Sequence, residues 1–237
     1  MFNHRKLRKL LTLISFPAFL KQYICTPKMD EKAQKILNQV RVLFMQYGIK
    51  SLTMDDIARH LGVSKKTLYQ SFSDKADLVS KGIEAHMNEE VAAICSIQEK
   101  SENAIEEMFL ISQHVSQHLQ SMHPSILFDL EKYYPSAFKK FNEYKTDVIM
   151  SCIAKNIEDG INQGFYRKNI NIPIVAGLYV GRMDILFDQQ LFPASQYNAK
   201  DVYFEAIRYH IRGIASEKGI EYLKDKFKSL DTQHPIF

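Results

Sequence analysis

Four polar side chains between positions 65 and 70 are of types that bind the edges of DNA bases: Lys65, Lys66, Tyr69 and Gln70. In a major groove lysine donates to guanine and glutamine to adenine, while tyrosine reaches a phosphate or a thymine methyl group. A helix that buries Leu68 and Phe72 would turn all four outward, because its faces repeat every three to four residues. The spacing therefore predicts a polar helix face that fits a major groove.

Two short helices and a tight turn are expected to position this face. Thr53 can cap a helix over residues 54–61, because its side-chain oxygen can accept from the free amides of the first turn. Gly62 then ends that helix, since glycine adopts the left-handed conformation that a tight turn needs. Ser64 can cap the next helix, which extends to about Phe72. This order of elements predicts a helix-turn-helix.

The residues around this unit support the same prediction. Ala58 is small enough for a close helix crossing, and apolar residues can lock the second helix against the first: Ile57, Leu61, Val63, Leu68 and Phe72. A preceding helix is predicted from Asp30 to Gly48, because apolar residues recur there at three- and four-residue intervals. A following helix opens at 73–74 with Lys75 in its first turn.

Two segments of this unit resemble the signature of the TetR family of transcriptional regulators. They are Ser-Leu-Thr-Met-Asp-Asp-Ile-Ala at residues 51–58 and Gly-Val-Ser-Lys-Lys-Thr-Leu-Tyr at residues 62–69, followed by Phe72 and Lys75. The resemblance covers about residues 30 to 80. It implies an all-α protein with an N-terminal three-helix helix-turn-helix domain that binds DNA. A larger C-terminal helical domain would bind a ligand and form a homodimer.

The resemblance also implies roles for single residues. The third helix would read bases through the four residues named first, and phosphates would be held by Thr53, Ser64, Thr67 and Lys75, with the hydroxyl of Tyr69. Thr53 and Lys75 lie at helix starts, where backbone amides also attract anions. Many members carry an aromatic residue or a histidine before the phenylalanine. Ser71 stands there in this chain, so a phosphate contact at that position would be weaker or absent.

Composition favours helices throughout the chain. Of 237 residues, 46% are hydrophobic and 24% charged, and only 9 glycines and 7 prolines interrupt them. Beyond residue 82 we expect no strand, and helix breaks near residues 121–124, 134–135, 160–173 and 192–193. We predict three parts: an N-terminal extension at 1–28, the helix-turn-helix DNA-binding domain at 29–80, and a helical ligand-sensing and dimerisation domain at 81–237.

Charge is distributed unevenly along the chain. Residues 1–28 hold six Lys/Arg and no acidic residue, residues 29–81 hold nine against six, and residues 82–237 hold sixteen against twenty-one. The net charges of the three segments are therefore +6, +3 and −5. A basic N-terminal third favours a polyanion-binding domain on a body that does not touch nucleic acid, with chance asymmetry as the alternative.

The first 28 residues also carry a pattern typical of export. A basic segment at residues 5–9 precedes an apolar run, as in a signal peptide. The run contains Pro17, is followed by Lys21 instead of a small-residue cleavage site, and is too short to span a bilayer. Because Met29 directly precedes the first well-patterned helix, we interpret residues 1–28 as a mis-assigned start or a loose basic arm. We expect a cytoplasmic protein with no membrane partner.

No pattern in the chain predicts catalysis, a cofactor or a metal site. The cysteines are odd in number and too widely spaced for a disulfide framework or a clustered zinc site: Cys25, Cys95 and Cys152. His114 and His118 have a spacing that can ligate a metal, with His123 nearby, but the residues between them lack the glutamate of a zinc-protease motif. We therefore predict a solvated face at these histidines and a protein that is not an enzyme.

The C-terminal two thirds predict a ligand-responsive dimer. Residues 174–187 and 201–214 are apolar on more than one face, which a second subunit or a larger monomer core would cover. Most mid-chain aromatic and methionine side chains are expected in the core, and a subset would line a cavity for an apolar or aromatic effector: Met108, Phe109, Phe128, Tyr133, Tyr134, Phe138, Phe141, Tyr144, Met150, Phe165 and Tyr166. No single ligand contact is predicted.

The resulting hypothesis is a repressor. A homodimer would place two recognition helices in successive major grooves about 34 Å apart on a palindromic operator, and the effector would release it. One alternative is a DNA-bound adaptor or structural protein without a ligand, favoured by a sealed body and an exposed apolar patch outside the dimer surface. The other is a helical enzyme, which would need His114, His118 and a carboxylate around one cavity.

Overall fold

The computed structural model describes residues 29–227, and the interpretation of residues 1–28 as a mis-assigned start or basic arm lies outside this part of the chain. All regular elements of the described residues are helical, apart from one isolated bridge between Tyr166 and Ala215. The predicted all-α fold is confirmed. None of the helices between residues 29 and 227 is long and apolar enough to cross a membrane.

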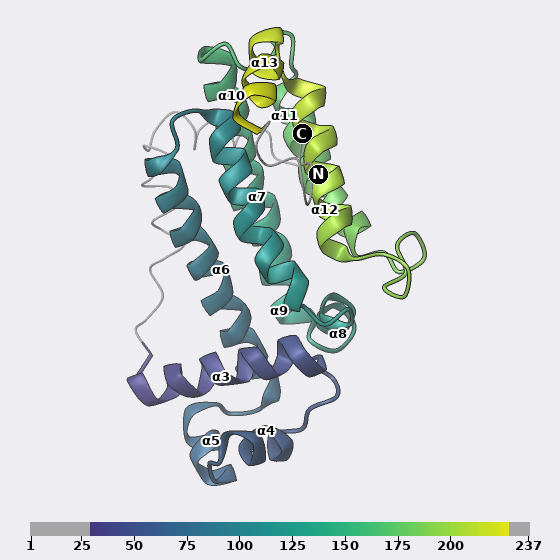
Figure 1. The fold of residues 1–237 in the computed structure, drawn as a ribbon. Coiled ribbons are helices and arrows are strands. Elements are labelled where there is room, and N and C mark those ends of the chain that lie inside the picture. The colour runs from purple at the N-terminus through teal and green to yellow at the C-terminus, as the bar shows by residue number, and fades with distance from the viewer. Residues whose placement is uncertain (1–28, 228–237) are drawn as a thin grey trace.

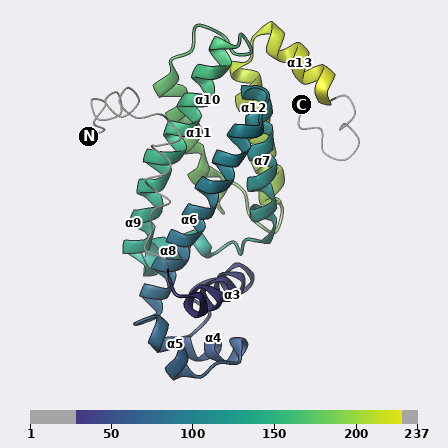
Figure 2. The same ribbon diagram turned by 90° about the vertical axis from the view of Figure 1, so that its left-hand side faces the viewer.

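Three helices form one end of the molecule, which we call the head (residues 29–74). Helix α3 (Glu31–Tyr47) lies across this end, with α4 (Met54–Leu61) and α5 (Lys65–Ser71) beyond it (Figures 1 and 2). Asp30 caps α3 by accepting from the backbone N–H of Ala33 at 2.9 Å, and Gly48 ends it with a φ of 78°. The helix bounds predicted for this region are confirmed to within a residue or two.

The longest helix, α6 (Lys75–Lys100), leaves the head and runs along the rest of the molecule, which we call the body (residues 82–227; Figure 1). Its other elements are α7 (Ala104–Ser121), α8 (Ile126–Tyr133), α9 (Pro135–Tyr144), a π-helical turn (Lys145–Ile149), α10 (Met150–Asn162), α11 (Ile172–Leu186), α12 (Ala199–Ile214) and α13 (Glu217–Phe227). The four breaks expected after residue 82 are confirmed.

Three irregularities of the body escaped prediction. Helices α6 and α7 are separated at residues 101–103, where Asn103 caps α7 by accepting from the backbone N–H groups of Ile105 and Glu106. Helices α12 and α13 are separated at residues 215–216. The π-helical turn is continuous with the helices before and after it. It contains neither glycine nor proline, so nothing in the sequence marks it.

Buried apolar residues form separate clusters along the molecule. The largest lies in the body between α7, α10, α11 and α12, and a smaller one lies between α6, α7 and the π-helical turn. The head cluster contains residues of α3 to α6 and also Ile126, Leu130 and Ala137 of α8 and α9. The head therefore completes its core with residues that lie about fifty positions further along the chain.

Helix α8 joins the head to the body through hydrogen bonds as well. The buried carboxylate of Asp129 accepts from the backbone N–H groups of Ile49 and Lys50, at 3.0 and 2.8 Å. In the loop just before α8, the backbone N–H of His123 donates to the carbonyl of Met45 at 2.9 Å. Residue 80, the predicted end of the DNA-binding domain, lies inside α6.

Candidate nucleic-acid interface

Local hydrogen bonds build the turn between α4 and α5. Thr53 and Asp56 form a capping box, in which the Asp56 N–H donates to the Thr53 hydroxyl at 3.1 Å and the Thr53 N–H donates to the Asp56 carboxylate at 3.0 Å. The Asp56 carboxylate accepts from the Thr53 hydroxyl and from the Thr53 N–H, and these two bonds hold the pKa of Asp56 below its usual range. Gly62 ends α4 in the left-handed region, with φ 63° and ψ 28°. The predicted caps and turn are therefore present.

Apolar side chains fix the angle of α5 against the rest of the head. Leu68 and Phe72 are fully buried, and Ile57 and Ala58 of α4 are buried in the same cluster. Leu61 and Val63, also predicted to lock the two helices, are partly buried against it. Because Leu68 points inward, the remaining faces of this short helix point away from the head core.

The four residues predicted to read bases lie on that outward side of α5. Lys65, Lys66, Tyr69 and Gln70 are all exposed, and Tyr69 keeps 47% of its surface accessible. Lys65 forms an ion pair with Asp55 of α4 at 2.6 Å, and the hydrogen bond to Asp55 raises the pKa of this lysine. Nothing in the sequence predicted this pair, because its members lie ten positions apart on either side of the turn.

The residues predicted to hold phosphates fall into two environments. The hydroxyls of Ser64 and Thr67 lie 2.9 Å apart at the start of α5, where the Thr67 N–H donates to Ser64. Thr53 is exposed at the start of α4. Lys75, in contrast, directs its ammonium group to the carbonyl of Ile49 at 2.7 Å, and its burial lowers its pKa. This bond uses one of the three donors of the ammonium group.

Comparison with known proteins agrees with this geometry. Residues 36–81 match the model of the bacterial regulatory proteins of the tetR family. This part of the chain is a TetR-family DNA-binding domain. TetR-family proteins are transcriptional regulators that bind DNA, so this chain is a DNA-binding transcriptional regulator and not an enzyme.

Full-length relatives extend the similarity beyond the TetR-type head. The uncharacterised HTH-type transcriptional regulator YvaF of Bacillus subtilis is 25% identical over 186 residues, which are 78% of this chain and 96% of that protein. A TetR-family regulator from Agrobacterium tumefaciens has a similar fold, with a TM-score of 0.65 at 17% identity over 78% of this chain and 98% of that one. A protein from Saccharomonospora viridis described as a transcriptional regulator, in complex with choline, has a TM-score of 0.63 at 17% identity over 79% and 99%.

Proposed function

We propose that this regulator is a repressor that binds a palindromic operator as a homodimer and is released by a small-molecule effector. Residues 29–80 would form the DNA-binding domain, and residues 81–237 would sense the effector and dimerise. The observation that carries the DNA-binding part is the outward face of α5, where Lys65, Lys66, Tyr69 and Gln70 are exposed together above buried Leu68. Such a face carries hydrogen-bond donors that can bind the acceptor atoms of base edges in a major groove.

The contacts of Lys65 are compatible with base reading. Its partner Asp55 is itself half-exposed, and an exposed ion pair of this kind contributes little to stability. A guanine with two acceptors can therefore replace the carboxylate at small cost. In the absence of DNA, Asp55 keeps the lysine near the groove-facing side of α5.

Phosphate contacts are proposed from both helix starts of the unit. Ser64 and Thr67 present hydroxyls at the start of α5, Thr53 does so at the start of α4, and free backbone amides there add to the attraction for an anion. Lys75 would contribute the remaining donors of its ammonium group while it stays bonded to Ile49. Such contacts position the protein on DNA, whereas α5 provides the sequence preference.

The proposed dimer surface is the outer face of α11 and α12. Ile174, Leu178 and Ile185 form an apolar stripe along α11, and Leu178 keeps 69% of its surface accessible. Tyr209 of α12 keeps 84%. Both helices have an opposite face that is buried in the large body cluster, so a second subunit is a suitable cover for the outer one.

The DNA-binding proposal is tested by selecting bound sequences from a random duplex pool and measuring affinity for the selected site. Lys65→Ala and Tyr69→Phe should each weaken binding, by about 1–3 kcal/mol where a base contact is lost. Lys168→Ala is the matched control, because Lys168 is exposed in the body far from α5. If the α5 variants bound like the control, α5 would not be the recognition helix.

The effector is proposed to combine an apolar part with a hydrogen-bonding group. Among the buried polar atoms of the described residues, Nη2 of Arg182 and Nε2 of His210 have no hydrogen-bond partner. Both side chains pack on Tyr179, with the guanidinium 3.9 Å from the centre of its ring and the His210 ring at 4.9 Å. A ligand acceptor at Arg182 would satisfy a donor whose isolation is costly.

Only part of the mid-chain aromatic set lies near this position. Met108, Phe109 and Tyr166 belong to the large body cluster, Tyr144 to the smaller one, and Tyr134 and Phe138 pack on the head cluster. A screen for compounds that release the operator would identify the effector, and Arg182→Met should then raise the concentration needed for release. Equal response of the variant would remove Arg182 from the effector site.

One observation favours the adaptor alternative. Phe128 and Tyr133 of α8 are exposed outside the α11 and α12 face, with ring centres 6.5 Å apart. An exposed aromatic pair beside the head could bind a protein partner. Failure of every compound to release DNA, together with loss of regulation in cells for Phe128→Ser, would support the adaptor over the effector-released repressor.

A further inference from the structure

Two pairs of metal-binding residue types face each other on α6 and α7. His86 and Glu90 are four residues apart on α6, and His114 and His118 are four residues apart on α7. Residues with this spacing lie on one face of a helix, one turn apart. Each helix therefore directs two potential ligands toward the other, from positions more than twenty residues apart in the sequence.

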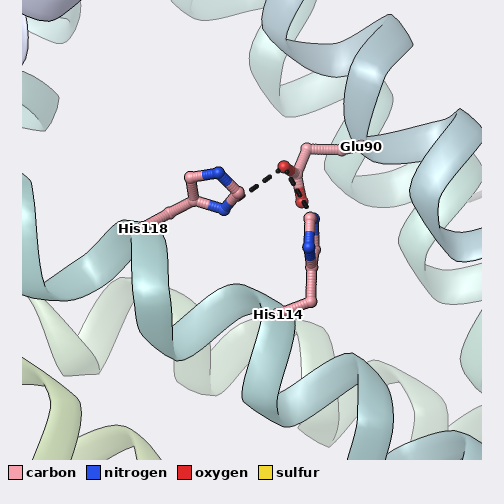
Figure 3. Close-up of side chains that lie close together, drawn as sticks. All are labelled: Glu90, His114 and His118. Carbon is pink, nitrogen blue, oxygen red and sulfur yellow. Dashed lines mark hydrogen bonds and ion pairs between the residues drawn. The ribbon is translucent and has the colours of Figure 1, made fainter.

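The side chains of His114 and His118 converge on one carboxylate oxygen of Glu90 (Figure 3). Nε2 of His114 lies 3.1 Å from Oε1 of Glu90, and Nδ1 of His118 lies 3.5 Å from the same oxygen. The three ligand atoms all lie within 4.8 Å of one another. The sequence had indicated the two histidines of α7 but not Glu90, so the solvated face predicted for them is in fact shared with a glutamate of α6.

We propose that Glu90, His114 and His118 bind a divalent transition-metal ion. Zn²⁺ binds imidazole nitrogen and carboxylate oxygen at about 2.0–2.2 Å, so ligand atoms of a tetrahedral site lie roughly 3.3 Å apart. Both distances from Glu90 are close to that value. The two imidazole nitrogens lie within 4.8 Å of each other, so side-chain rotations would have to bring them closer by up to about 1.5 Å to complete three corners of the tetrahedron.

The donor set selects the kind of ion. Two imidazoles and one carboxylate suit Zn²⁺, Co²⁺ or Ni²⁺, whereas Mg²⁺ and Ca²⁺ favour sets made of oxygen. His86 lies next to the group, with its ring centre 5.9 Å from that of His118, and could supply a fourth nitrogen after a side-chain rotation. Otherwise a water or a ligand of the ion would occupy the fourth position.

The three side chains differ in burial, which would give an ion a low-dielectric environment on one side and access from solvent on the other. Glu90 keeps only 13% of its side-chain surface accessible and His114 keeps 26%, while His118 keeps 47%. The carboxylate is thus largely screened from water. In this low-dielectric environment its charge attracts a cation strongly. Entry is possible from the His118 side, where the site meets solvent.

A pair of simple hydrogen bonds from two imidazoles to Glu90 would give similar distances, and the experiment separates the two explanations. The full chain, stripped of metal with a chelator and kept reduced, is titrated with Co²⁺, and its visible absorption is recorded. Binding at this site should give one ion per chain and the intense visible bands of four- or five-coordinate Co²⁺, which Zn²⁺ should abolish by competition.

Conservative variants assign the site. Glu90→Gln and His118→Gln should each weaken Co²⁺ binding at least about 100-fold, the upper end of what losing an outer-shell partner costs. Glu99→Gln, an exposed glutamate of the same helix, and His60→Asn, an exposed histidine of the head, are the matched controls. Circular dichroism checks that every variant is helical, and His118 is exposed enough for its replacement to leave the core unchanged.

Three results would overturn the proposal. The first is a Co²⁺ spectrum typical of six-coordinate, largely hydrated ions. The second is binding that Glu90→Gln and His118→Gln leave as strong as in the controls. The third is loss of binding in His60→Asn, which would place the ion in the head. None of these outcomes depends on operator binding, so the experiment tests the metal site independently of the repressor proposal.

Discussion

The carboxylate of Asp129 in α8 accepts a 3.0 Å hydrogen bond from the backbone N–H of Ile49, in the loop that leads from α3 to α4. A second bond, from the N–H of Lys50, is 2.8 Å long, and a third comes from the hydroxyl of Ser125 at 3.1 Å; the acid is buried. The loop ahead of the helix-turn-helix is thereby held by a residue of the body. A backbone contact of this kind depends little on which side chains the loop carries.

Asp129→Ala should destabilise the protein by about 1–3 kcal/mol, because it leaves two amide groups without an acceptor where water reaches them poorly. Thermal unfolding followed by circular dichroism measures the change. Glu131→Ala is the control, since Glu131 is exposed on the same helix and should change stability by no more than about 0.5 kcal/mol. Equal melting temperatures for the two variants would mean that Asp129 does not hold the loop.

Lys75→Ala should weaken binding to specific and non-specific DNA by the same factor. Losing one phosphate contact removes one released counterion, so the slope of log affinity against log salt should become shallower by about 1. The variant also loses its bond to the Ile49 carbonyl, so its folding must be checked before DNA is added. An altered base preference would contradict the proposed phosphate role, and Lys168→Ala provides the comparison for charge.

Leu178→Asp should convert a dimer into monomers, because it places a charge in the middle of the apolar stripe of α11. Sedimentation velocity gives the mass, and operator affinity should fall with it, since a palindrome is bound by two heads. Phe128→Asp changes an equally apolar exposed residue on α8. A monomer from Phe128→Asp and a dimer from Leu178→Asp would move the interface from α11 to α8.

His210 should make the protein sensitive to acid. Its burial, with the nearby charge of Arg182, lowers its pKa from 6.5 to about 3. Between these values the unfolded chain binds a proton that the folded chain does not, so stability is present above pH 6.5 and is lost as pH falls toward 3. Urea unfolding from pH 7 to 4 should show a steeper decline than in His210→Leu. Parallel curves would mean that this histidine does not titrate on unfolding.

The sequence predicted the features that depend on neighbouring residues. Thr53, Ser64 and Gly62 act on amides or carbonyls within five positions, so residue type and spacing alone identify the caps and the turn of the helix-turn-helix. The outward face of α5 follows from the burial of Leu68 on the same helix. Local chemistry of this kind is visible without knowledge of the fold.

The features that escaped prediction join distant parts of the chain. Asp129 meets Ile49 across 80 positions, and Glu90 meets His114 across 24, so each pair depends on how whole helices pack. Lys75 was predicted to hold a phosphate, and its hydrogen bond to the carbonyl of Ile49, 26 positions away, was not predicted. Spacing along one helix cannot predict such partners, because they come from another helix or loop.

Helix α6 connects the body to the DNA-binding head, so a tilt of this helix in the body would move the head. Its 26 residues form a rod about 39 Å long, and the fifteen residue-to-residue steps from Lys75 to Glu90 correspond to about 22 Å. A tilt of about 5° around Glu90 would displace the start of this rod by about 2 Å. In a symmetric pair the two heads would separate by up to about 4 Å, against a groove spacing of about 34 Å. Such a tilt would thus change the spacing of the two heads relative to the DNA helical repeat.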